Sequence, residues 1–388
     1  EEFIKKFHID LNEQQWMAVQ AVERPTLLLA VPGSGKTTVL VTRIGYMVYC
    51  KGIAPEEILV VTYNVAAKND MCSRCERMFG EELASHVEFR TINGICAKAI
   101  AIYSRMVRKA AFSLLSDESE KAKILSMIYQ QVERDFPSEN DLSDLATRIT
   151  FIKNRMLSEK EIEAFGEEAE YDLVEIYQRY RKELRARSLM DFDDQMVYAY
   201  NMFRSAPELL EAFQRQYHYL CVDEAQDTSK IQHDMMDLLA AKSRNLFMVG
   251  DEDQSIYGFR AAYPQALVEF ESRHPGAQLL LMETNYRSRQ EIVRAADQLI
   301  QKNRNRHAKT MTAARAAGGC VTEIRAVSRQ GQYNYLLKVA EDCEQETAVL
   351  YRNNESALPI IDMLERKGLS YRVKNTDMTF FSHPVVND

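Results

Sequence analysis

The chain has 388 residues, and its content of 46% hydrophobic and 27% charged residues is that of a soluble globular protein of about two to three domains. No apolar run approaches the ~20 residues that cross a bilayer, and the first residues lack signal-peptide form, so we expect a cytoplasmic protein without a membrane partner. The net charge of −8 excludes a chain-wide basic field for nucleic acid but allows a local basic groove.

The cysteines indicate a reducing compartment. Seven cysteines form no dense framework, which argues for free thiols. Cys72 and Cys75 make a single C-x-x-C pair, and without a second pair we expect helix packing rather than zinc binding.

The first predicted element is a helix over residues 13–22, with Asn12 as its N-cap. The amide of Gln15 offers a donor and an acceptor that fit an adenine edge. A glutamine exposed at a helix start, with no ligand, is the alternative interpretation.

A strand, a glycine-containing loop and a helix follow in the order that forms a phosphate cradle. The apolar run 26–30 predicts a buried strand, and residues 39–44 predict a helix. Backbone N–H groups at the helix start wrap an anion, which the helix dipole also favours. Gly33 and Gly35 lack the Cβ that would block this approach.

The side chains of this loop suit the phosphates of a nucleotide such as ATP. Lys36 reaches the terminal phosphates, and the hydroxyl of Thr37 is placed to ligate Mg²⁺. Ala30 stands where the first glycine of the G-x-x-x-x-G-K-[ST] pattern is expected. The predicted loop contacts are Ala30, Val31, Pro32, Gly33, Ser34, Gly35, Lys36, Thr37 and Thr38.

Further along, residues 58–63 and 87–91 predict two more strands, the first buried on both faces. Tyr63 stands at a strand end, where open α/β sheets bind ligands, although the sequence alone favours a core aromatic there. Residues 104–188 then change to long amphipathic helical patterns. Within them, residues 176–187 interleave tyrosine with arginine, which suits either a phosphate-tracking face or a solvated helix with i,i+4 pairs.

A later strand ends in two adjacent acids. Residues 217–222 lead into Asp223, which at the strand tip can join an Mg²⁺ shell, and Glu224, which can deprotonate a water that attacks a γ-phosphate. Downstream of a phosphate loop, this pair predicts the second half of an NTPase site.

The next predicted strand, residues 245–250, runs into a loop that carries groups of two kinds. Gln254 and Arg260 could sense a γ-phosphate, while Tyr257 and Phe259 could stack on bases. Residues 279–282 predict one further buried strand.

With these residues collected, the chain resembles the UvrD/Rep-type superfamily 1 DNA helicases. The resemblance is carried, in order, by LNEQQ (11–15), AVPGSGKTT (30–38), VTYN (61–64), RTINGIC (90–96), DFDDQM (191–196), VDEAQDTSKIQ (222–232), VGDEDQSIYGFRAA (249–262) and METNYRS (282–288). It implies an α/β fold, a RecA-like P-loop NTPase with a parallel sheet and a helical insert, followed by an incomplete second RecA-like domain. The implied domains are residues 1–100 and 189–282 for the first RecA-like domain, 101–188 for the insert and 283–388 for the start of the second. For the second domain we expect strands at residues 321–325, 348–352 and 370–373 and a helix at 356–366.

The resemblance also implies roles for individual residues. Gln15 and Tyr286 would contact adenine, Lys36 and Thr37 the phosphates and Mg²⁺, and Asp223 the metal. Glu224 would be the base, with Gln254, Arg260 and Arg287 at the γ-phosphate. The residues matching single-stranded DNA contacts are Tyr63, Thr91, Asn93, Tyr257 and Phe259. In this pattern Asn93 replaces a usual histidine, Phe259 stands where many relatives have tryptophan, and Thr38 where some carry arginine.

The implied function is an ATP-dependent DNA helicase that moves 3′ to 5′ on single-stranded DNA or a 3′-tailed duplex, with protein partners unspecified. Because the last two helicase motifs of the resemblance are missing, we expect a fragment whose own turnover is weak. Two alternatives stay open, a subunit of a helicase–nuclease recombination complex and a non-catalytic remnant that binds ATP or DNA.

Overall fold

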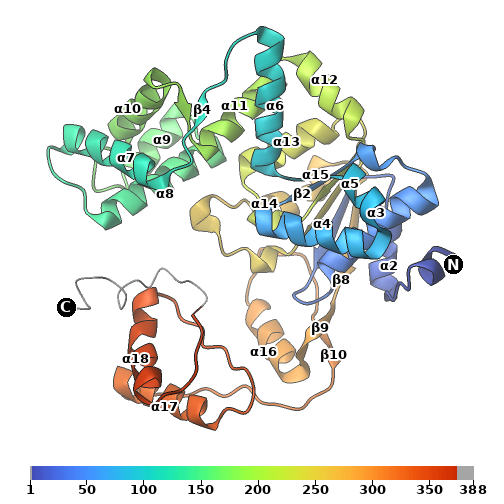
Figure 1. The fold of residues 1–388 in the computed structure, drawn as a ribbon, viewed down its shortest axis with the longest axis vertical. Coiled ribbons are helices and arrows are strands. Elements are labelled where there is room, and N and C mark those ends of the chain that lie inside the picture. Colours follow the sequence, from blue (N-terminus) through green and yellow to red (C-terminus); the bar gives the residue numbers. More distant parts are fainter. Residues whose placement is uncertain (1, 374–388) are drawn as a thin grey trace. The chain divides into compact units, whose positions relative to one another are not determined.

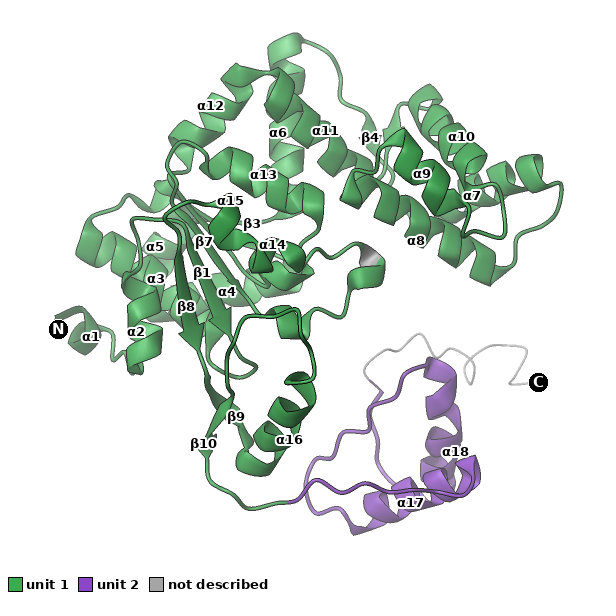
Figure 2. Ribbon diagram, turned by 180° about the vertical axis from the view of Figure 1, so that it is seen from behind, with its two compact units in different colours: residues 1–319 green, residues 320–388 purple. Residues whose placement is uncertain are grey.

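The computed structural model describes the backbone of residues 2–373 and all of their side chains except that of Arg260. It contains two compact units, residues 1–319 and 320–388 (Figure 2). In the described part of the chain, no helix is long and apolar enough to cross a membrane.

The first unit is built on a six-stranded parallel sheet (Figure 1). Its strands, in spatial order, are β3 (Glu88–Thr91), β2 (Ile58–Thr62), β6 (Tyr219–Val222), β7 (Leu246–Gly250), β1 (Thr26–Ala30) and β8 (Gln278–Met282). Every residue of β1, β2 and β7 is buried, as expected for parallel strands that are covered on both faces. The prediction of an α/β parallel sheet is therefore confirmed.

Helices cover both faces of this sheet because alternate strand residues point to opposite sides. One face packs against α1 (Glu2–Lys6), α2 (Glu13–Gln20), α3 (Lys36–Lys51), α4 (Val65–Phe79) and α5 (Glu81–His86). The other face packs against α6 (Ile92–Val107), α11 (Phe192–Ser205), α12 (Pro207–Gln216), α13 (Lys230–Ala240), α14 (Gln265–Val268) and α15 (Phe270–Arg273). Cys75 lies in the first core, within α4, as the helix-packing interpretation of the C-x-x-C pair predicts.

Four helices between α6 and α11 pack around a core of their own and form a separate group in Figure 1. They are α7 (Glu118–Glu133), α8 (Glu139–Arg155), α9 (Glu159–Gly166) and α10 (Leu173–Ala186), beside a small parallel pair of β4 (Ser113–Leu114) and β5 (Leu189–Met190). In α10, Tyr177 and Tyr180 point into this core. Arg179 pairs with Glu175 one turn away, so the arginine face of α10 is the solvated helix with i,i+4 pairs.

Helix α8 fastens this helical group to the sheet domain. Its Lys153 ammonium lies 2.8 Å from carboxylate oxygens of both Asp191 and Asp194 at the start of α11. The Arg155 guanidinium stacks 4.5 Å from the ring centre of Tyr263, beyond the loop that follows β7. The helical group is thus held beside the polar loops at the ends of β6 and β7.

Short 3₁₀ turns shape the connecting loops: η1 (Pro55–Glu57), η2 (Ala225–Asp227), η3 (Glu252–Gln254) and η4 (Gly258–Arg260). After β8 the chain forms the parallel pair β9 (Thr284–Arg289) and β10 (Thr312–Arg315), with α16 (Gln290–Ile300) between them.

The second unit contains helices but, within residues 320–373, no strand. Its elements are α17 (Arg329–Asp342), η5 (Asn354–Ala357) and α18 (Leu358–Arg366), and α18 confirms the helix expected near residues 356–366. The three strands expected at 321–325, 348–352 and 370–373 are wrong for this structure. A strand needs a neighbour for its backbone N–H and C=O groups, and these exposed stretches pair with none. Residues 374–388 lie outside the described part.

Candidate functional site

The loop between β1 and α3 has the backbone form of an anion cradle. Gly33 and Gly35 adopt φ of 69° and 88°, a region that side chains disfavour. A Cβ on Gly33 would also come within 2.7 Å of the Arg287 Cβ. Gly35 is the N-cap of α3 and supplies no side-chain cap, so the first N–H groups of the helix stay available for an anion.

Gln15 braces this loop from the neighbouring helix. Its Nε2 donates to the Ser34 carbonyl oxygen at 2.9 Å, and its Oε1 accepts from the Asn12 N–H at 2.9 Å in the capping box that starts α2. The Asn12 amide in turn donates to the Tyr286 hydroxyl at 2.7 Å. The structure therefore brings Gln15 and Tyr286, the two predicted adenine contacts, to one side of the loop.

The two acids that follow β6 sit beside Lys36. The Lys36 ammonium is 2.6 Å from Glu224 Oε2, with side chains 13% and 36% exposed respectively. Glu224 adopts φ of 49°, a left-handed conformation that is uncommon for a residue with a side chain. Unlike Arg108, Arg134 and Met156, which adopt this conformation as helix C-caps, Glu224 follows a strand, where surrounding contacts must impose it.

The two carboxyl groups have opposite pKa shifts. Burial, followed by the charge of Glu224, raises the pKa of Asp223 to about 6. Burial also acts to raise the pKa of Glu224, but the charge of Lys36 and the hydrogen bond from Gln226 outweigh it, so this pKa is lowered. Glu224 is thus a carboxylate near neutral pH, as a proton acceptor must be.

A chain of hydrogen bonds links Glu224 to the loop after β7. Gln226 Nε2 donates to Glu224 Oε2 at 2.8 Å, and Gln226 Oε1 accepts from the Asp251 N–H at 3.0 Å. Asp251 Oδ2 then accepts from Gln254 Nε2 at 2.7 Å. The predicted γ-phosphate sensor Gln254 is therefore joined to the predicted base through two residues that sequence reasoning did not assign.

Strand β9 brings Arg287 against the phosphate loop. The Tyr286 N–H donates to the Gly33 carbonyl oxygen at 2.9 Å. The Asn285 carboxamide oxygen accepts from the N–H groups of Arg287 and Ser288, each at 2.8 Å, which fixes the turn beyond it. Arg287 is close enough to contribute to the lowered pKa of Glu224. The Arg260 side chain lies outside the described residues.

The donor set fits an anion and a hard divalent cation. Among the described residues, the Ser34 hydroxyl and one oxygen of Asp227 are buried without a protein hydrogen-bond partner. The half-buried Thr37 lies in the first turn of α3, and the Asp223 carboxylate follows β6. Hydroxyl and carboxylate oxygens are the ligands that Mg²⁺ prefers.

A groove of about 540 Å³ runs between the sheet domain and the helical group, and it contains three of the predicted DNA contacts. Tyr63, Asn93 and Phe259 line it together with residues of α8 and α11. Tyr63 is 40% exposed and Phe259 59% exposed, so the core interpretation of Tyr63 is wrong. The Tyr63 and Tyr257 rings are nearly parallel, with centres 6.3 Å apart. The loops thus offer a row of aromatic faces.

Two of the predicted DNA contacts, Thr91 and Asn93, also make hydrogen bonds within the protein. Thr91 caps α6, where its hydroxyl accepts from the Gly94 N–H at 3.2 Å. The Asn93 amide donates to the Phe192 carbonyl oxygen at 2.9 Å. Thr91 therefore caps α6, and Asn93 links α6 to α11 beside the groove.

Comparisons with known proteins give a single family. The model of the UvrD/REP helicase N-terminal domain matches residues 11–275, and that of the UvrD-like helicase C-terminal domain matches residues 280–388. The ATP-dependent DNA helicase PcrA of Leuconostoc citreum is 31% identical over 369 residues, which cover 93% of this chain and 49% of that protein. A putative ATP-dependent DNA helicase, YjcD, of Bacillus subtilis is 31% identical over 97% of this chain and 50% of its own length. PcrA of Bacillus subtilis is 32% identical over 94% and 50%. The chain thus spans about half the length of these relatives.

Proposed function

The chain belongs to the UvrD/Rep helicase family, and from that membership and the site geometry we propose that it binds and hydrolyses ATP to drive movement along single-stranded DNA. The observation that carries the proposal is the Lys36–Glu224 pair at the mouth of the phosphate loop. One member can hold a phosphate and the other can take a proton from water.

In this proposal the phosphate loop holds the nucleotide. The α3 N–H groups and Lys36 bind the phosphates, and Gln15 and Tyr286 lie on the adenine side. Thr37 and Asp223 would hold Mg²⁺, which neutralises phosphate charge when it is bound.

Hydrolysis then depends on groups that meet at the γ-phosphate. Glu224 accepts the proton of the attacking water, while Gln254 orients that water. Arg287, and Arg260 by its position in the sequence, stabilise the negative charge that develops on the transferred group.

DNA would lie in the groove between the sheet domain and the helical group. Tyr63, Tyr257 and Phe259 offer rings on which bases of any sequence can stack. Asn93 lines the groove, and Thr91 caps the helix that carries Asn93. The groove lining carries Lys121 but also three carboxylates, Glu118, Asp193 and Asp227, which favours stacking over phosphate contacts as the main attraction. The proposed substrate is a single strand, or the single-stranded tail of a 3′-tailed duplex, and the 3′ polarity comes from the family resemblance.

The test is steady-state ATPase of the 388-residue chain with and without an oligo-dT strand. The proposal expects weak Mg²⁺-dependent turnover that the strand stimulates. ATP binding without turnover would refute the enzymatic proposal and leave a binding protein. Turnover that DNA does not change would refute the coupling to DNA.

A further inference from the structure

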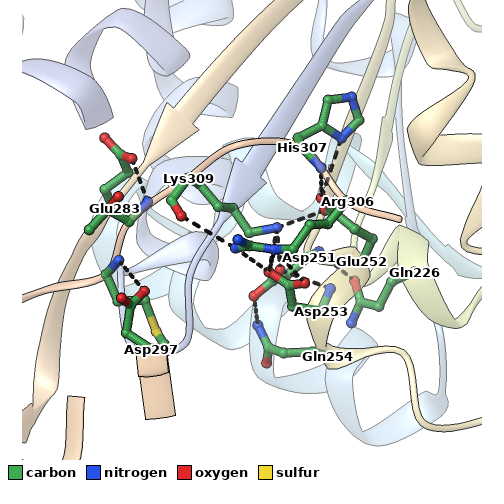
Figure 3. A network of polar contacts seen from close by, with 12 residues as sticks. Gln226, Asp251, Glu252, Asp253, Gln254, Glu283, Asp297, Arg306, His307 and Lys309 are labelled. Atoms are coloured by element: carbon green, nitrogen blue, oxygen red, sulfur yellow. Dashed lines mark hydrogen bonds and ion pairs between the residues drawn. The ribbon is translucent and has the colours of Figure 1, made fainter. Parts of the chain in front are cut away.

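Three consecutive acidic side chains after β7 converge on one buried lysine (Figure 3). The Lys309 ammonium lies 2.8 Å from Asp251 Oδ1, 2.9 Å from Glu252 Oε2 and 3.0 Å from Asp253 Oδ2. The Lys309 side chain is only 2% exposed. Buried carboxylates repel one another strongly unless a cation compensates them, so Lys309 is what allows this loop to fold inward.

Two neighbours of Lys309 complete the compensation. The Arg306 guanidinium meets both oxygens of Asp253, with Nε 2.9 Å from Oδ1 and Nη2 2.7 Å from Oδ2. The His307 N–H donates to Glu252 Oε1 at 2.8 Å. Residues 306–309 therefore form a basic clasp around the acidic triplet 251–253.

Hydrogen bonds join the residues that follow the basic clasp to β9, the strand that carries Arg287, and to α16. Directly after the clasp, the Thr310 N–H donates to Glu283 Oε1 at 2.9 Å, and the Met311 N–H donates to Asp297 Oδ1 at 3.1 Å. Glu283 immediately precedes β9, and Asp297 lies in α16 (Figure 3). The clasp thus joins β9 and α16 to the loop that follows β7.

Asp251 stands between the basic clasp and Gln254. One of its oxygens contacts Lys309, and the other accepts from Gln254 Nε2 at 2.7 Å. A carboxylate accepts hydrogen bonds and does not donate them, so it selects the NH₂ end of the Gln254 amide. The carbonyl end, Oε1, is left to accept a hydrogen bond from a water molecule.

We propose that Lys309 is a positioning residue for ATP hydrolysis, because it holds Asp251 in place and thereby fixes the Gln254 amide in the orientation that aligns the attacking water, and that Arg306 supports it through Asp253. The inference rests on the ATPase function proposed above. A buried ion cluster is weak evidence of stabilisation, since apolar side chains of similar volume often serve a fold equally well. Here the cluster does what apolar side chains cannot, which is to orient an amide.

The test compares Lys309→Met with a matched control, Lys153→Met. Lys153 is also 2% exposed, and its ammonium is 2.8 Å from each of two carboxylates, but those carboxylates belong to Asp191 and Asp194, and the hydrogen bond of the Gln254 amide goes to Asp251 instead. In Lys309→Met we expect DNA-free kcat to fall roughly 10- to 100-fold, the scale of a misplaced catalytic group, with KM for ATP within about twofold. Lys153→Met should lower thermal stability and leave both constants within about twofold.

A double-mutant cycle separates positioning from general damage. If Lys309 acts through Gln254, then Lys309→Met should cost little further kcat in a Gln254→Ala background. Independent, multiplying losses of kcat in the cycle would overturn the inference, as would an equal loss of kcat in Lys153→Met.

Hydrogen exchange measures the positioning without turnover. Peptides covering residues 250–258 should exchange at least tenfold faster in Lys309→Met, while peptides from β1 stay unchanged. If the wild-type chain hydrolyses no ATP, the proposed function fails. The hydrogen exchange of residues 250–258 then still tests whether Lys309 holds this loop in place. Unchanged exchange at residues 250–258 overturns the inference in either case.

Discussion

Glu224→Gln should separate nucleotide binding from hydrolysis. The substitution keeps the shape of the side chain and its hydrogen bond from Gln226, but it removes the charge that lies 2.6 Å from the Lys36 ammonium. Bound phosphate must compete with that charge for Lys36. The variant should therefore bind ATP as well as the wild type or somewhat better.

The size of the gain follows from the exposure of the pair. Glu224 is 36% exposed, so solvent screens the ion pair, and we assign it about 1 kcal/mol, the upper end for such pairs. Since 1.4 kcal/mol is tenfold in affinity, the variant should bind ATP up to about fivefold more tightly. Hydrolysis should slow by roughly 10² or more, because the proton acceptor is lost.

The two effects are measured on the same protein preparations. Titration with a fluorescent ATP analogue gives the affinity, and single-turnover hydrolysis gives the rate of chemistry. Wild-type protein in the same buffer is the reference. Weaker binding combined with persistent turnover per bound ATP would show that Glu224 is a structural residue and not the base.

Three further predictions address the phosphate loop, the groove and the core. Lys36→Ala should lower the affinity for a fluorescent ATP analogue at least tenfold with little change in thermal unfolding, since its partner Glu224 is partly solvated; unchanged affinity would contradict the phosphate role. Replacing Tyr257 and Phe259 together by alanine should weaken oligo-dT binding, measured by fluorescence anisotropy, well beyond either single change. Each stacked base contributes about 1–3 kcal/mol, and unchanged affinity in the double variant would place the DNA elsewhere. Burial lowers the pKa of His233 from 6.5 to about 4, so stability present above pH 6.5 is lost as the pH falls toward 4. The loss amounts to about 2 kcal/mol at pH 5, and urea unfolding at pH 7 and pH 5 should show it in the wild type and not in His233→Asn.

Those parts of the site that depend on local chemistry could be predicted from the sequence. The phosphate loop needs Gly33 and Gly35 for its backbone and Lys36 for its charge, and all three are neighbours in the chain. The Asp223–Glu224 pair follows a buried strand directly. In such segments the residue types and the geometry they serve lie within a few positions of each other.

The parts that depend on distant partners could not be predicted. Lys309 looks like a solvated surface lysine until the fold brings three carboxylates from more than fifty residues away to its ammonium. The alternation of tyrosine and arginine in residues 176–187 fitted a phosphate-tracking face equally well. The packing of Tyr177 and Tyr180 and the pairing of Arg179 with Glu175 decide against it. The sequence contains one weak local sign of a buried cation, which is the run of three acidic residues after β7. That run indicates that some cation must compensate it, but it does not identify Lys309.

The contacts around the phosphate loop bear on how nucleotide and DNA binding could be coupled. The Gly33 carbonyl oxygen accepts a hydrogen bond from the Tyr286 N–H, so a main-chain hydrogen bond joins β9 to the loop that would hold the phosphates. Gln254 and Phe259 stand only a few residues apart in the loop after β7, and the basic clasp ties the start of this loop back to the β9 segment. A ligand shifts such a structure only by binding its alternative arrangements with different affinity. Because the γ-phosphate would touch Gln254 and Arg287 together, its loss on hydrolysis would release a contact at each end of this connection. Two of the proposed base-stacking residues, Tyr257 and Phe259, lie on the loop that carries Gln254.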